Sequence, residues 1–384
     1  PAKGSRAYSW KENDRLTSIQ VDNQQATRFF HDTRGNLSGA SYENGEVEYR
    51  APDEVGNLFR QLNREDRSYG PGGQLLLNNG KTYTYDVEGR LLSKTDPEGG
   101  EWHYQWMANG LLSQVQRPDN KIVRFTYDAL GRRIRKEFEG ETTHWIWDKD
   151  VPLHEWKTKD LSHSLEVTFQ ESDILLNEKE PPTNEWLDLD LENQDDSLTP
   201  DFSHTTNEFK IPQTEVSTWV FEPNLFAPLA LIRGNQFFSI MTDHMGVPIC
   251  MYDEEKNMIW GAEASIFGDL RNLKGNRALV PFRYPGQYED EETGLYYNRF
   301  RYYDPQDGVY ISQDPSSLEE GGIYLYTYVP DPLIWIDELG LKKKSRSRKP
   351  RHVSTKSTGR TRTRTKNEAF AFDQRAVILF KTRK

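Results

Sequence analysis

The chain of 384 residues has one cysteine, Cys250, and no long apolar run. A single cysteine cannot form an intramolecular disulfide, and it excludes a zinc site made of several cysteines. No segment has the length and hydrophobicity of a membrane-spanning helix, and the start, PAKGSRAYSW, has neither Met nor a signal-peptide pattern. We therefore expect packing alone to hold the fold, and we interpret the chain as a fragment of a longer protein.

Apolar residues are scarce, at 35% of the chain, whereas aromatic residues reach 12%. This balance indicates many half-buried, amphipathic surfaces in place of one large apolar centre. Aromatic side chains pack well on the pleated surface of a sheet. The composition therefore favours β-structure.

Acidic residues become rare after Leu341, where the sign of the charge reverses. Residues 342–384 contain 16 Lys and Arg and 2 Asp and Glu, a net charge of about +14. Subtracting these from the totals of 49 and 60 leaves 33 bases and 58 acids before the boundary, about −25. We interpret the two parts as separate functional units that meet at Leu341.

Self-similarity is present over the first 150 residues. Five segments share one form, HDTRGNL, PDEVGNL, YDVEGRL, WMANGLL and YDALGRR, with glycines at Gly35, Gly56, Gly89, Gly110 and Gly131. These glycines are separated by 21, 33, 21 and 21 residues, and an earlier copy, WKENDRL, has Asp14 at the glycine position. The 33-residue gap contains SYGPGGQLLLNNGK, which we interpret as a turn-rich insertion.

Each copy has the chemistry of a tight turn between two strands. Asp favours the start of a turn because its side chain bonds the backbone two residues on, and Gly supplies a positive φ. The flanking residues alternate between apolar and polar, as in YTYD and RLLSKT. The repeats therefore predict stacked β-hairpins that form a long curved sheet.

An acidic stretch interrupts this pattern. Residues 171–209 hold 12 acids and one Lys. Low hydrophobicity and repulsion between like charges cannot offset the entropy of ordering, so we expect a mostly irregular loop over 160–215. Two interpretations stay open: a solvated loop, or a negative surface for the basic end of the chain.

The last part before Leu341 carries a specific signature. It includes TWVFEP, TDHMGVPICMYD and FRYPGQYEDEETGLYYNRFRYYDPQDGVYISQDP. Together with the repeats, this sequence resembles the Rhs and YD-repeat family over about residues 1–341. The resemblance implies an all-β fold in which repeated hairpins form a spiralling sheet that builds part of a hollow shell, with a C-terminal plug region.

The resemblance and the charge boundary divide the chain into four parts. We expect YD-repeat hairpins over 1–150, strand ends with the long acidic loop over 151–217, the C-terminal core region with a self-cleavage motif over 218–341, and a basic tail that starts the toxin or cargo region over 342–384.

The resemblance also implies a self-cleavage site. The family motif has Asp-Pro, a spacer, and Asp-Pro-x-Gly-Leu, with cleavage after the Leu. Here it matches Asp331 and Pro332, then Asp337, Gly340 and Leu341, so the predicted cut lies between Leu341 and Lys342.

By the same resemblance, the carboxylates that would perform the cut are those of Asp314 and Asp337. Two carboxyl groups brought close together share a proton and can divide the roles of general acid and general base. Because the bond belongs to the same chain, a single turnover needs no separate binding step.

Three departures from the family pattern affect this expectation. Val309 stands between Gly308 and Tyr310 where the family usually has Arg, so we expect the chain to lack an arginine that orients the aspartates. Glu338 replaces the proline of the motif, and Ser317 stands where a glycine is usual. These changes predict a retained fold with slow or lost cleavage.

The tail has alternating Arg, Thr and Ser, and then AFAFDQRAVILF, which could form one or two strands. It has no HExxH sequence, Walker-type loop or Cys/His ligand set, so we assign it no catalytic residue, and we expect no metal and no cofactor. Basic density of this kind can bind nucleic acid through phosphates, or it can serve as a leader before a cargo domain.

Two classes of function stay open. The first is the C-terminal part of an Rhs-type polymorphic toxin, a bacterial β-shell that encloses its own C-terminal effector and releases it by aspartyl self-cleavage. Its expected partners are a secretion-system spike or chaperone and a cognate immunity protein, with synthesis in the bacterial cytoplasm and export to a target cell or the cell surface. The second is a non-catalytic surface or adhesion scaffold, or a nucleic-acid-binding protein that acts through the tail.

Overall fold

The structure, a computed structural model, describes residues 5–12, 15–159, 216–316 and 325–341, and the backbone of 344–345 and 362–365. The acidic segment 160–215, Asp14, Ser317, Lys342 and AFAFDQRAVILF lie outside the described residues. Among the described residues no helix is long and apolar enough to cross a membrane.

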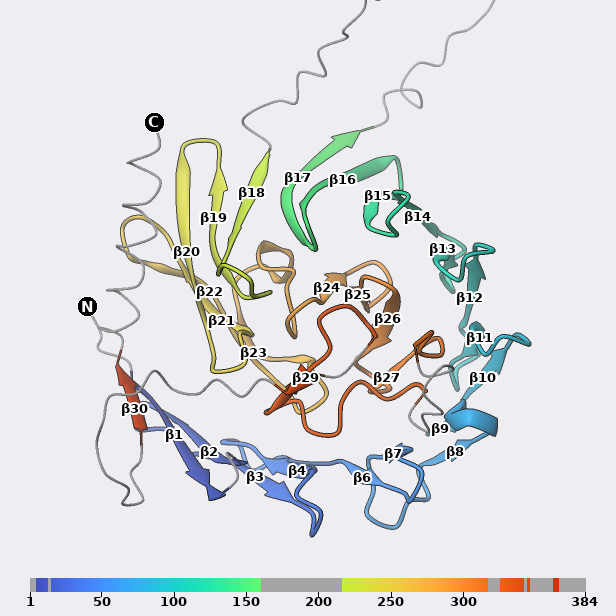
Figure 1. Cartoon of the computed structure of the whole chain (residues 1–384), viewed down its shortest axis with the longest axis horizontal. Coiled ribbons are helices and arrows are strands. Elements are labelled where there is room, and N and C mark those ends of the chain that lie inside the picture. Colours follow the sequence, from blue (N-terminus) through green and yellow to red (C-terminus); the bar gives the residue numbers. More distant parts are fainter. Residues whose placement is uncertain are drawn as a thin grey trace, which may run out of the picture.

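Strands that follow one another in the chain pair antiparallel and form one winding ribbon (Figure 1). It begins with β1 (Ser5–Lys11), β2 (Arg15–Val21), β3 (Thr27–His31), β4 (Leu37–Ser41) and β5 (Val47–Tyr49), and continues through the short pair of β6 (Ala51–Pro52) and β7 (Leu58–Phe59). This meander confirms the prediction of an all-β fold built from repeated hairpins.

The ribbon then becomes a sheet that, within the described residues, has 16 strands, β8 to β23, in sequence order. They are β8 (Arg67–Tyr69), β9 (Leu75–Asn78), β10 (Lys81–Tyr85), β11 (Leu91–Thr95), β12 (Glu101–Trp106), β13 (Leu112–Gln116), β14 (Ile122–Tyr127), β15 (Arg133–Phe138), β16 (Glu141–Asp148), β17 (Val151–Lys159), β18 (Ser217–Phe221), β19 (Pro228–Arg233), β20 (Gln236–Thr242), β21 (Pro248–Tyr252), β22 (Met258–Ala264) and β23 (Leu270–Lys274). The sheet continues across the predicted acidic loop, because β17 pairs directly with β18.

The repeat turns have the predicted chemistry. In the turn between β10 and β11, Asp86 Oδ1 accepts hydrogen bonds from the backbone N–H of Glu88 at 2.9 Å and of Arg90 at 2.8 Å. Gly89 closes the turn with a φ of +74°, which a residue with a Cβ adopts only at a cost. Local sequence therefore fixes the position of each hairpin.

The aromatic residue before each turn links one hairpin to the next. Its O–H or N–H donates to a carbonyl that lies two residues after the glycine of the preceding turn: Tyr85 to Leu75 at 3.1 Å, Trp106 to Leu91 at 2.8 Å, Tyr127 to Leu112 at 2.7 Å, and Trp147 to Arg133 at 2.7 Å. This ladder explains why a Tyr or Trp recurs beside the Asp: a buried ring needs a partner for its polar atom.

The 33-residue gap between Gly56 and Gly89 is occupied by a further hairpin, β8–β9. Its turn contains the short 3₁₀ helix Pro71–Gly73, and Gly73 has a φ of +87°. Tyr69 O–H donates to the Leu58 carbonyl, as in the other hairpins. The segment interpreted as a turn-rich insertion is therefore a further hairpin of the ribbon, and its turn lacks the Asp.

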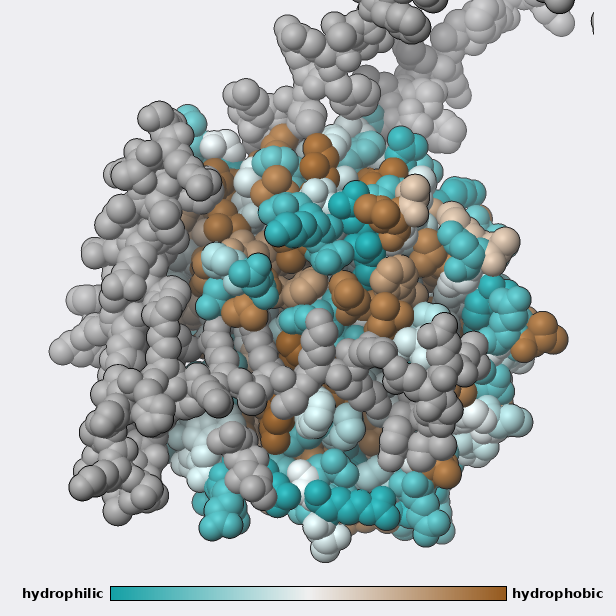
Figure 2. All heavy atoms as spheres, viewed as in Figure 1, coloured by the Kyte–Doolittle hydropathy of each residue, from teal (hydrophilic) through white to brown (hydrophobic). Residues whose placement is uncertain are grey.

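The ribbon curves into a ring around a central plug (Figure 1). After the 3₁₀ helix Arg277–Leu279, the plug forms a small sheet of β24 (Tyr288–Asp290), β25 (Leu295–Asn298), β26 (Arg301–Asp304) and β27 (Val309–Tyr310). The buried core is shared, since wall residues such as Leu112 and Trp260 belong to the same cluster as Tyr297 and Tyr302 of the plug. On the face in Figure 2, hydrophobic residues gather near the centre, and the coloured residues along the lower edge are mainly hydrophilic.

Buried ion pairs attach the plug to the wall. Lys94 on β11 contacts Asp304 at 3.1 Å, and Lys136 on β15 contacts Asp290 at 3.2 Å. Arg133 contacts Asp290 as well and lies over the rings of four aromatic residues, Phe125, Trp145, Tyr288 and Tyr297. Because a buried charge is costly without a partner, these contacts fix the orientation of the plug.

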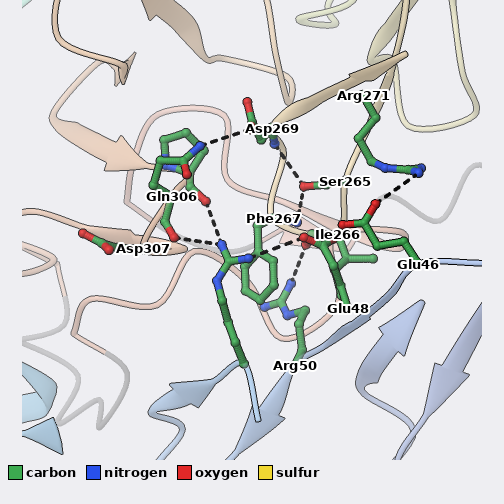
Figure 3. A network of polar contacts seen from close by, with 12 residues as sticks. Glu46, Glu48, Arg50, Ser265, Ile266, Phe267, Asp269, Arg271, Gln306 and Asp307 are labelled. Atoms are coloured by element: carbon green, nitrogen blue, oxygen red, sulfur yellow. Dashed lines mark hydrogen bonds and ion pairs between the residues drawn. The ribbon is translucent and has the colours of Figure 1, made fainter. Parts of the chain in front are cut away.

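The two ends of the ribbon meet beside the turn between β22 and β23, where Figure 3 shows a polar network. Arg50, which follows β5, donates to the carbonyl of Ile266 in this turn at 3.3 Å and to that of Val329 at 2.8 Å. Gln306 of the plug donates to Asp269 at 3.1 Å. Arg6 on β1 pairs with Glu263 on β22 at 3.2 Å, so side chains close the ring at this seam.

Two short strands of the tail are described by their backbone. β29 (Lys344–Ser345) pairs with β28 (Trp335–Ile336), which lies between Pro332 and Asp337 of the predicted cleavage motif. β30 (Arg362–Thr365) pairs with the outer edge of β1. The predicted cut between Leu341 and Lys342 therefore lies in the connection between two paired strands.

Candidate active site

Asp314 and Asp337, the two predicted catalytic residues, meet at one arginine. Arg301 on β26 places Nη2 at 2.9 Å from Asp337 Oδ2 and at 3.3 Å from Asp314 Oδ2. All three side chains are buried. The expectation that the chain lacks an arginine to orient the aspartates is therefore wrong, because Arg301 contacts both carboxylates.

Arg301 also holds the backbone of the cleavage motif. Its Nε donates to the Gly340 carbonyl at 2.6 Å, and its Nη1 donates to the Leu325 carbonyl at 3.2 Å. The guanidinium lies over the ring of Tyr310, 3.6 Å from its centre. One positive charge thus faces two carboxylates and reduces the repulsion that would separate them in a buried site.

The carboxylate of Asp337 is held on both oxygens. Oδ1 accepts the backbone N–H of Leu341 at 2.8 Å, and Oδ2 accepts the Tyr310 O–H at 2.8 Å. Burial, together with the charge of Asp337, raises the pKa of Tyr310 far above its usual value, so the phenol stays a donor. Asp337 therefore contacts the residue whose carbonyl forms the predicted scissile bond.

Asp314 turns its other oxygen toward the loop that follows it. Oδ1 accepts hydrogen bonds from the backbone N–H of Ser316 at 2.9 Å and from its hydroxyl at 2.7 Å. The backbone N–H of Asp314 donates to the Leu325 carbonyl at 3.0 Å. These contacts leave Oδ2 directed at Arg301.

The backbone of 337–341 lies in a narrow cradle that requires glycines. Gly340 has a φ of +68°, and a Cβ there would lie 2.6 Å from the Asn298 carbonyl oxygen. A Cβ on Gly286 would lie 2.1 Å from the carbonyl oxygen of Glu338, the residue that replaces the motif proline. Asn298 Nδ2 donates to the Asp337 carbonyl at 2.9 Å. The plug therefore lies against the motif on two sides, at Asn298 and at Gly286.

Asp331 and Pro332, the first pair of the motif, form the turn that leads into β28. Asp331 Oδ1 accepts the N–H of Leu333 at 2.9 Å, and its carbonyl accepts the N–H of Trp335 at 2.8 Å. Asp331 Oδ2 lies 3.6 Å from His31 Nε2 on β3. Lys342 lies outside the described residues, so its side of the predicted cut has no structural account.

The sequence supplied the two aspartates through a resemblance, but it did not supply Arg301. Arg301 stands 13 residues before Asp314 and 36 before Asp337, and only the plug's strand pairing brings the three together. An available signal was the position of Arg301 itself: it is a charged residue inside FRYYD, a segment rich in aromatic residues. Among the described side chains, no group of three or more His, Cys, Asp or Glu could hold a metal ion.

Family models match two parts of the chain. Residues 6–154 match the model described as teneurin YD-shell, and residues 240–274 match the model described as RHS protein.

Several bacterial proteins have similar sequences. Double-stranded DNA deaminase toxin A of Burkholderia cenocepacia is 28% identical over 362 residues, which cover 88% of this chain and 22% of that protein. Toxin protein Tse5 of Pseudomonas aeruginosa is 26% identical over 355 residues, 87% of this chain and 25% of that protein. The putative uncharacterized protein YlbH of Escherichia coli is 47% identical over 94 residues, 24% of this chain and 39% of that protein. The chain thus spans a quarter or less of the two toxins.

A solved structure, the TcdB2-TccC3-Cdc42 crystal structure, aligns with 88% of this chain and 18% of its own, at 19% identity and a TM-score of 0.47.

Proposed function

Because this chain is a member of the Rhs and YD-repeat family, we propose that it is the C-terminal part of an Rhs-type polymorphic toxin. In this proposal the ring and its plug close one end of a β-shell, and the polypeptide beyond Leu341 is the start of the enclosed effector. The toxin names of similar proteins support it, as does the charge reversal at Leu341.

The same proposal includes release of the effector by hydrolysis of the bond between Leu341 and Lys342. Water adds to the Leu341 carbonyl carbon, the bond to the Lys342 nitrogen breaks, and the new amine takes a proton. One carboxylate of the pair Asp314 and Asp337 accepts a proton from the water, and the other, protonated, assists the carbonyl and then supplies the proton to the nitrogen. Arg301 positions both groups. Since catalyst and substrate share one chain, each molecule reacts once.

The observation that carries this proposal is the joint contact of Arg301 with both carboxylates and with the Gly340 carbonyl, next to a Leu341 N–H that Asp337 binds. A water-activating carboxylate must lie within hydrogen-bond reach of the reacting peptide. The carbonyl of Glu338, the residue in place of the motif proline, lies beside Gly286 of the plug, where a Cβ would come within 2.1 Å of it.

The test compares the purified chain with Asp314→Asn and Asp337→Asn on a denaturing gel. We expect the wild-type chain to yield two fragments, ending and beginning at the Leu341–Lys342 bond, and each variant to stay intact. Mass spectrometry of the fragments identifies the cut. A wild-type chain that remains whole after long incubation would contradict the self-cleavage mechanism. It would not contradict the proposal that the chain forms part of a shell.

The partners and the location belong to the same proposal. A secretion-system spike or chaperone would deliver the toxin from the bacterial cytoplasm to a target cell, and a cognate immunity protein would protect the producing cell. Co-purification of the chain from its native host, with identification of bound proteins, tests these partners. Recovery of none of the three classes would contradict this part of the proposal.

A second candidate function is nucleic-acid binding by the tail, favoured by its net charge of about +14.

A further inference from the structure

Asn298, the last residue of β25, contacts both the cleavage motif and the phenol of Tyr310. Its side chain is fully buried, and its Nδ2 lies 2.9 Å from the Asp337 carbonyl oxygen and 2.7 Å from the Tyr310 oxygen. A carbonyl oxygen can only accept a hydrogen bond, so the Asn298 amide must turn its nitrogen, and not its oxygen, toward these two atoms. Asn298 therefore donates to both.

This contact fixes the direction in which the Tyr310 O–H points. The phenol oxygen accepts from Asn298, so its own hydrogen is directed to its other neighbour, Asp337 Oδ2, at 2.8 Å. Arg301 Nη2 donates to the same carboxylate oxygen at 2.9 Å. A carboxylate oxygen has about two acceptor positions. Both positions of Asp337 Oδ2 are therefore occupied by donors, and this oxygen has no place for a proton.

The second oxygen of Asp337 faces the residue whose carbonyl would be attacked. Oδ1 accepts the Leu341 N–H at 2.8 Å, its one hydrogen bond among the described residues. Its other acceptor position can take a proton from a water that attacks the Leu341 carbonyl carbon. Donors that bind a carboxylate favour the ionised form, and Asp337 has three of them. These contacts suit a general base.

Asp314 is held differently. Arg301 Nη2 lies 3.3 Å from its Oδ2, and among the described residues this oxygen accepts no other hydrogen bond. Its Oδ1 accepts the N–H and the hydroxyl of Ser316, and a hydroxyl can reverse and accept in its turn. A proton on Asp314 Oδ2 therefore displaces no donor other than a distant one. These contacts suit a general acid.

We propose that Asn298 is a positioning residue that acts through Tyr310 to keep Asp337 ionised. Asp337 is then the base of the pair, and Asp314 is the acid. The inference rests on the proposed self-cleavage and assigns the two roles within it. Without the amide of Asn298, the phenol can turn its hydrogen away, and Asp337 loses a donor that favours its charge.

Each role moves one proton. Asp337 Oδ1 takes a proton from the water while the water oxygen bonds to the Leu341 carbonyl carbon. Asp314 donates a hydrogen bond to the carbonyl oxygen and gives its proton to the Lys342 nitrogen when the carbon–nitrogen bond breaks. The pair ends with Asp337 protonated and Asp314 ionised. It does not need to be reset, because each molecule reacts once.

The pH profile of cleavage in the full chain tests the assignment. The rate decreases at low pH where the base becomes protonated, and at high pH where the acid becomes ionised. Loss of a donor makes a carboxyl group harder to ionise. We therefore expect Asn298→Leu and Tyr310→Phe to move the acidic limb up by about one pH unit and to leave the alkaline limb in place. Ser316→Ala should move only the alkaline limb, also upward.

A matched control separates these shifts from effects on the fold. Tyr303→Phe removes a buried hydrogen bond to the Phe267 carbonyl and should leave both limbs in place. The reverse pattern, in which Ser316→Ala moves the acidic limb and Tyr310→Phe the alkaline one, would exchange the roles and overturn the proposal. Slower cleavage by Asn298→Leu with both limbs unmoved would make Asn298 a part of the fold alone.

A second measurement does not depend on cleavage. If the wild-type chain stays whole, the proposed self-cleavage fails, and carbon NMR of the labelled aspartate carboxyl groups still tests the order of ionisation. The two signals are identified by their loss in Asp314→Asn and Asp337→Asn. We expect the Asp337 signal to reach its ionised position at a lower pH than the Asp314 signal, and Asn298→Leu to reduce this difference. The opposite order would overturn the proposal.

Discussion

At the residue scale, Arg301 has more consequences than any other side chain of the candidate site. We predict that Arg301→Met abolishes cleavage and lowers the free energy of unfolding by about 3–5 kcal/mol, because two buried carboxylates lose their shared partner. Urea unfolding and a denaturing gel measure the two effects. The control is Arg299→Met, on the same hairpin, whose partner Asp150 is exposed, so its cost is about 1 kcal/mol or less. An Arg301→Met variant that cleaves normally would contradict the role given to this arginine.

A substitution at Tyr310 can distinguish an effect on the cleavage rate from an effect on the free energy of unfolding. Tyr310→Phe removes the O–H that binds Asp337, and Tyr303→Phe removes one that binds the Phe267 carbonyl at 2.8 Å. Both rings are fully enclosed, so each variant should lose about 1–2 kcal/mol. We predict that only Tyr310→Phe slows cleavage, which a time course on a gel measures. Equal rates in the two variants would show that the phenol of Tyr310 serves the fold alone.

The origin of the site explains what a sequence can and cannot predict about it. The resemblance to the family indicated Asp314, Asp337 and Gly340. Arg301 became visible only when the pairing of β25, β26 and β27 brought it to the aspartates, since local sequence carries no information about which residues meet across a fold. The expected absence of an arginine came from reading a single position, Val309, and a neighbouring strand supplies the group that this position lacks.

At the scale of elements, the repeat turns differ in what surrounds them. Gly89 and Gly110 occupy the same position of two successive copies of the repeat, with φ of +74° and +81°. A Cβ on Gly89 would lie 2.2 Å from Gln313 and 2.5 Å from Tyr326, whereas a Cβ on Gly110 has no atom within 4 Å. Alanine at Gly110 would therefore introduce backbone strain alone, whereas alanine at Gly89 would introduce the same strain and a clash with Gln313 and Tyr326.

We predict that Gly110→Ala costs about 1 kcal/mol, the price of a left-handed backbone with a Cβ, and that Gly89→Ala costs more, at least about 2 kcal/mol. Chemical denaturation of the two variants measures the difference. Equal free energies of unfolding of the two variants would contradict a close contact of Gln313 and Tyr326 with the turn at Gly89.

The hairpins themselves were largely predictable, because Asp and Gly act through local backbone geometry. The sequence missed β8–β9, whose turn around Gly72 and Gly73 has no Asp and whose spacing departs from 21 residues. It also gave no indication that Tyr69 joins the hydrogen-bond ladder, since the acceptor, Leu58, lies on another hairpin. Periodicity reveals regular copies, whereas an irregular copy is recognised only by its neighbours.

At the scale of the whole molecule, the buried side chain of His244 makes the free energy of unfolding depend on pH. It lies in the turn between β20 and β21, where its Nε2 contacts the Leu333 carbonyl at 3.1 Å and its ring packs against Tyr8 and Trp10. Burial lowers the pKa of His244 below 6.5; the negative charges of Asp243 and Asp331 oppose this effect and Arg6 adds to it. The unfolded chain therefore binds a proton more readily than the folded one as the pH falls below about 6.5.

We predict that the free energy of unfolding is fully retained above pH 6.5 and decreases as the pH falls from 6.5 toward the lower pKa of folded His244. His244→Gln should flatten this part of the profile, and His103→Gln, whose side chain is 45% exposed, should leave it unchanged. Thermal unfolding between pH 7 and pH 5 measures all three proteins. A profile of the His244→Gln variant that parallels the wild type would contradict this assignment.

The basic tail gives a prediction about binding. If residues 342–384 contact phosphates, the chain should bind DNA with an affinity that falls steeply with salt, by roughly tenfold or more between 50 and 200 mM. A chain that ends at Leu341 should not bind. Fluorescence anisotropy with a labelled duplex measures both, and binding that persists without the tail would refute its role.

The pairing of β28 with β29 determines how a pulling force would travel through the molecule. Before hydrolysis, tension applied to the far end of the tail reaches the plug through covalent bonds. After hydrolysis of the bond in this connection, the same tension is carried by a few main-chain hydrogen bonds, each of which contributes about 1 kcal/mol. The cut would then convert a permanent tether into one that a translocating machine can unzip.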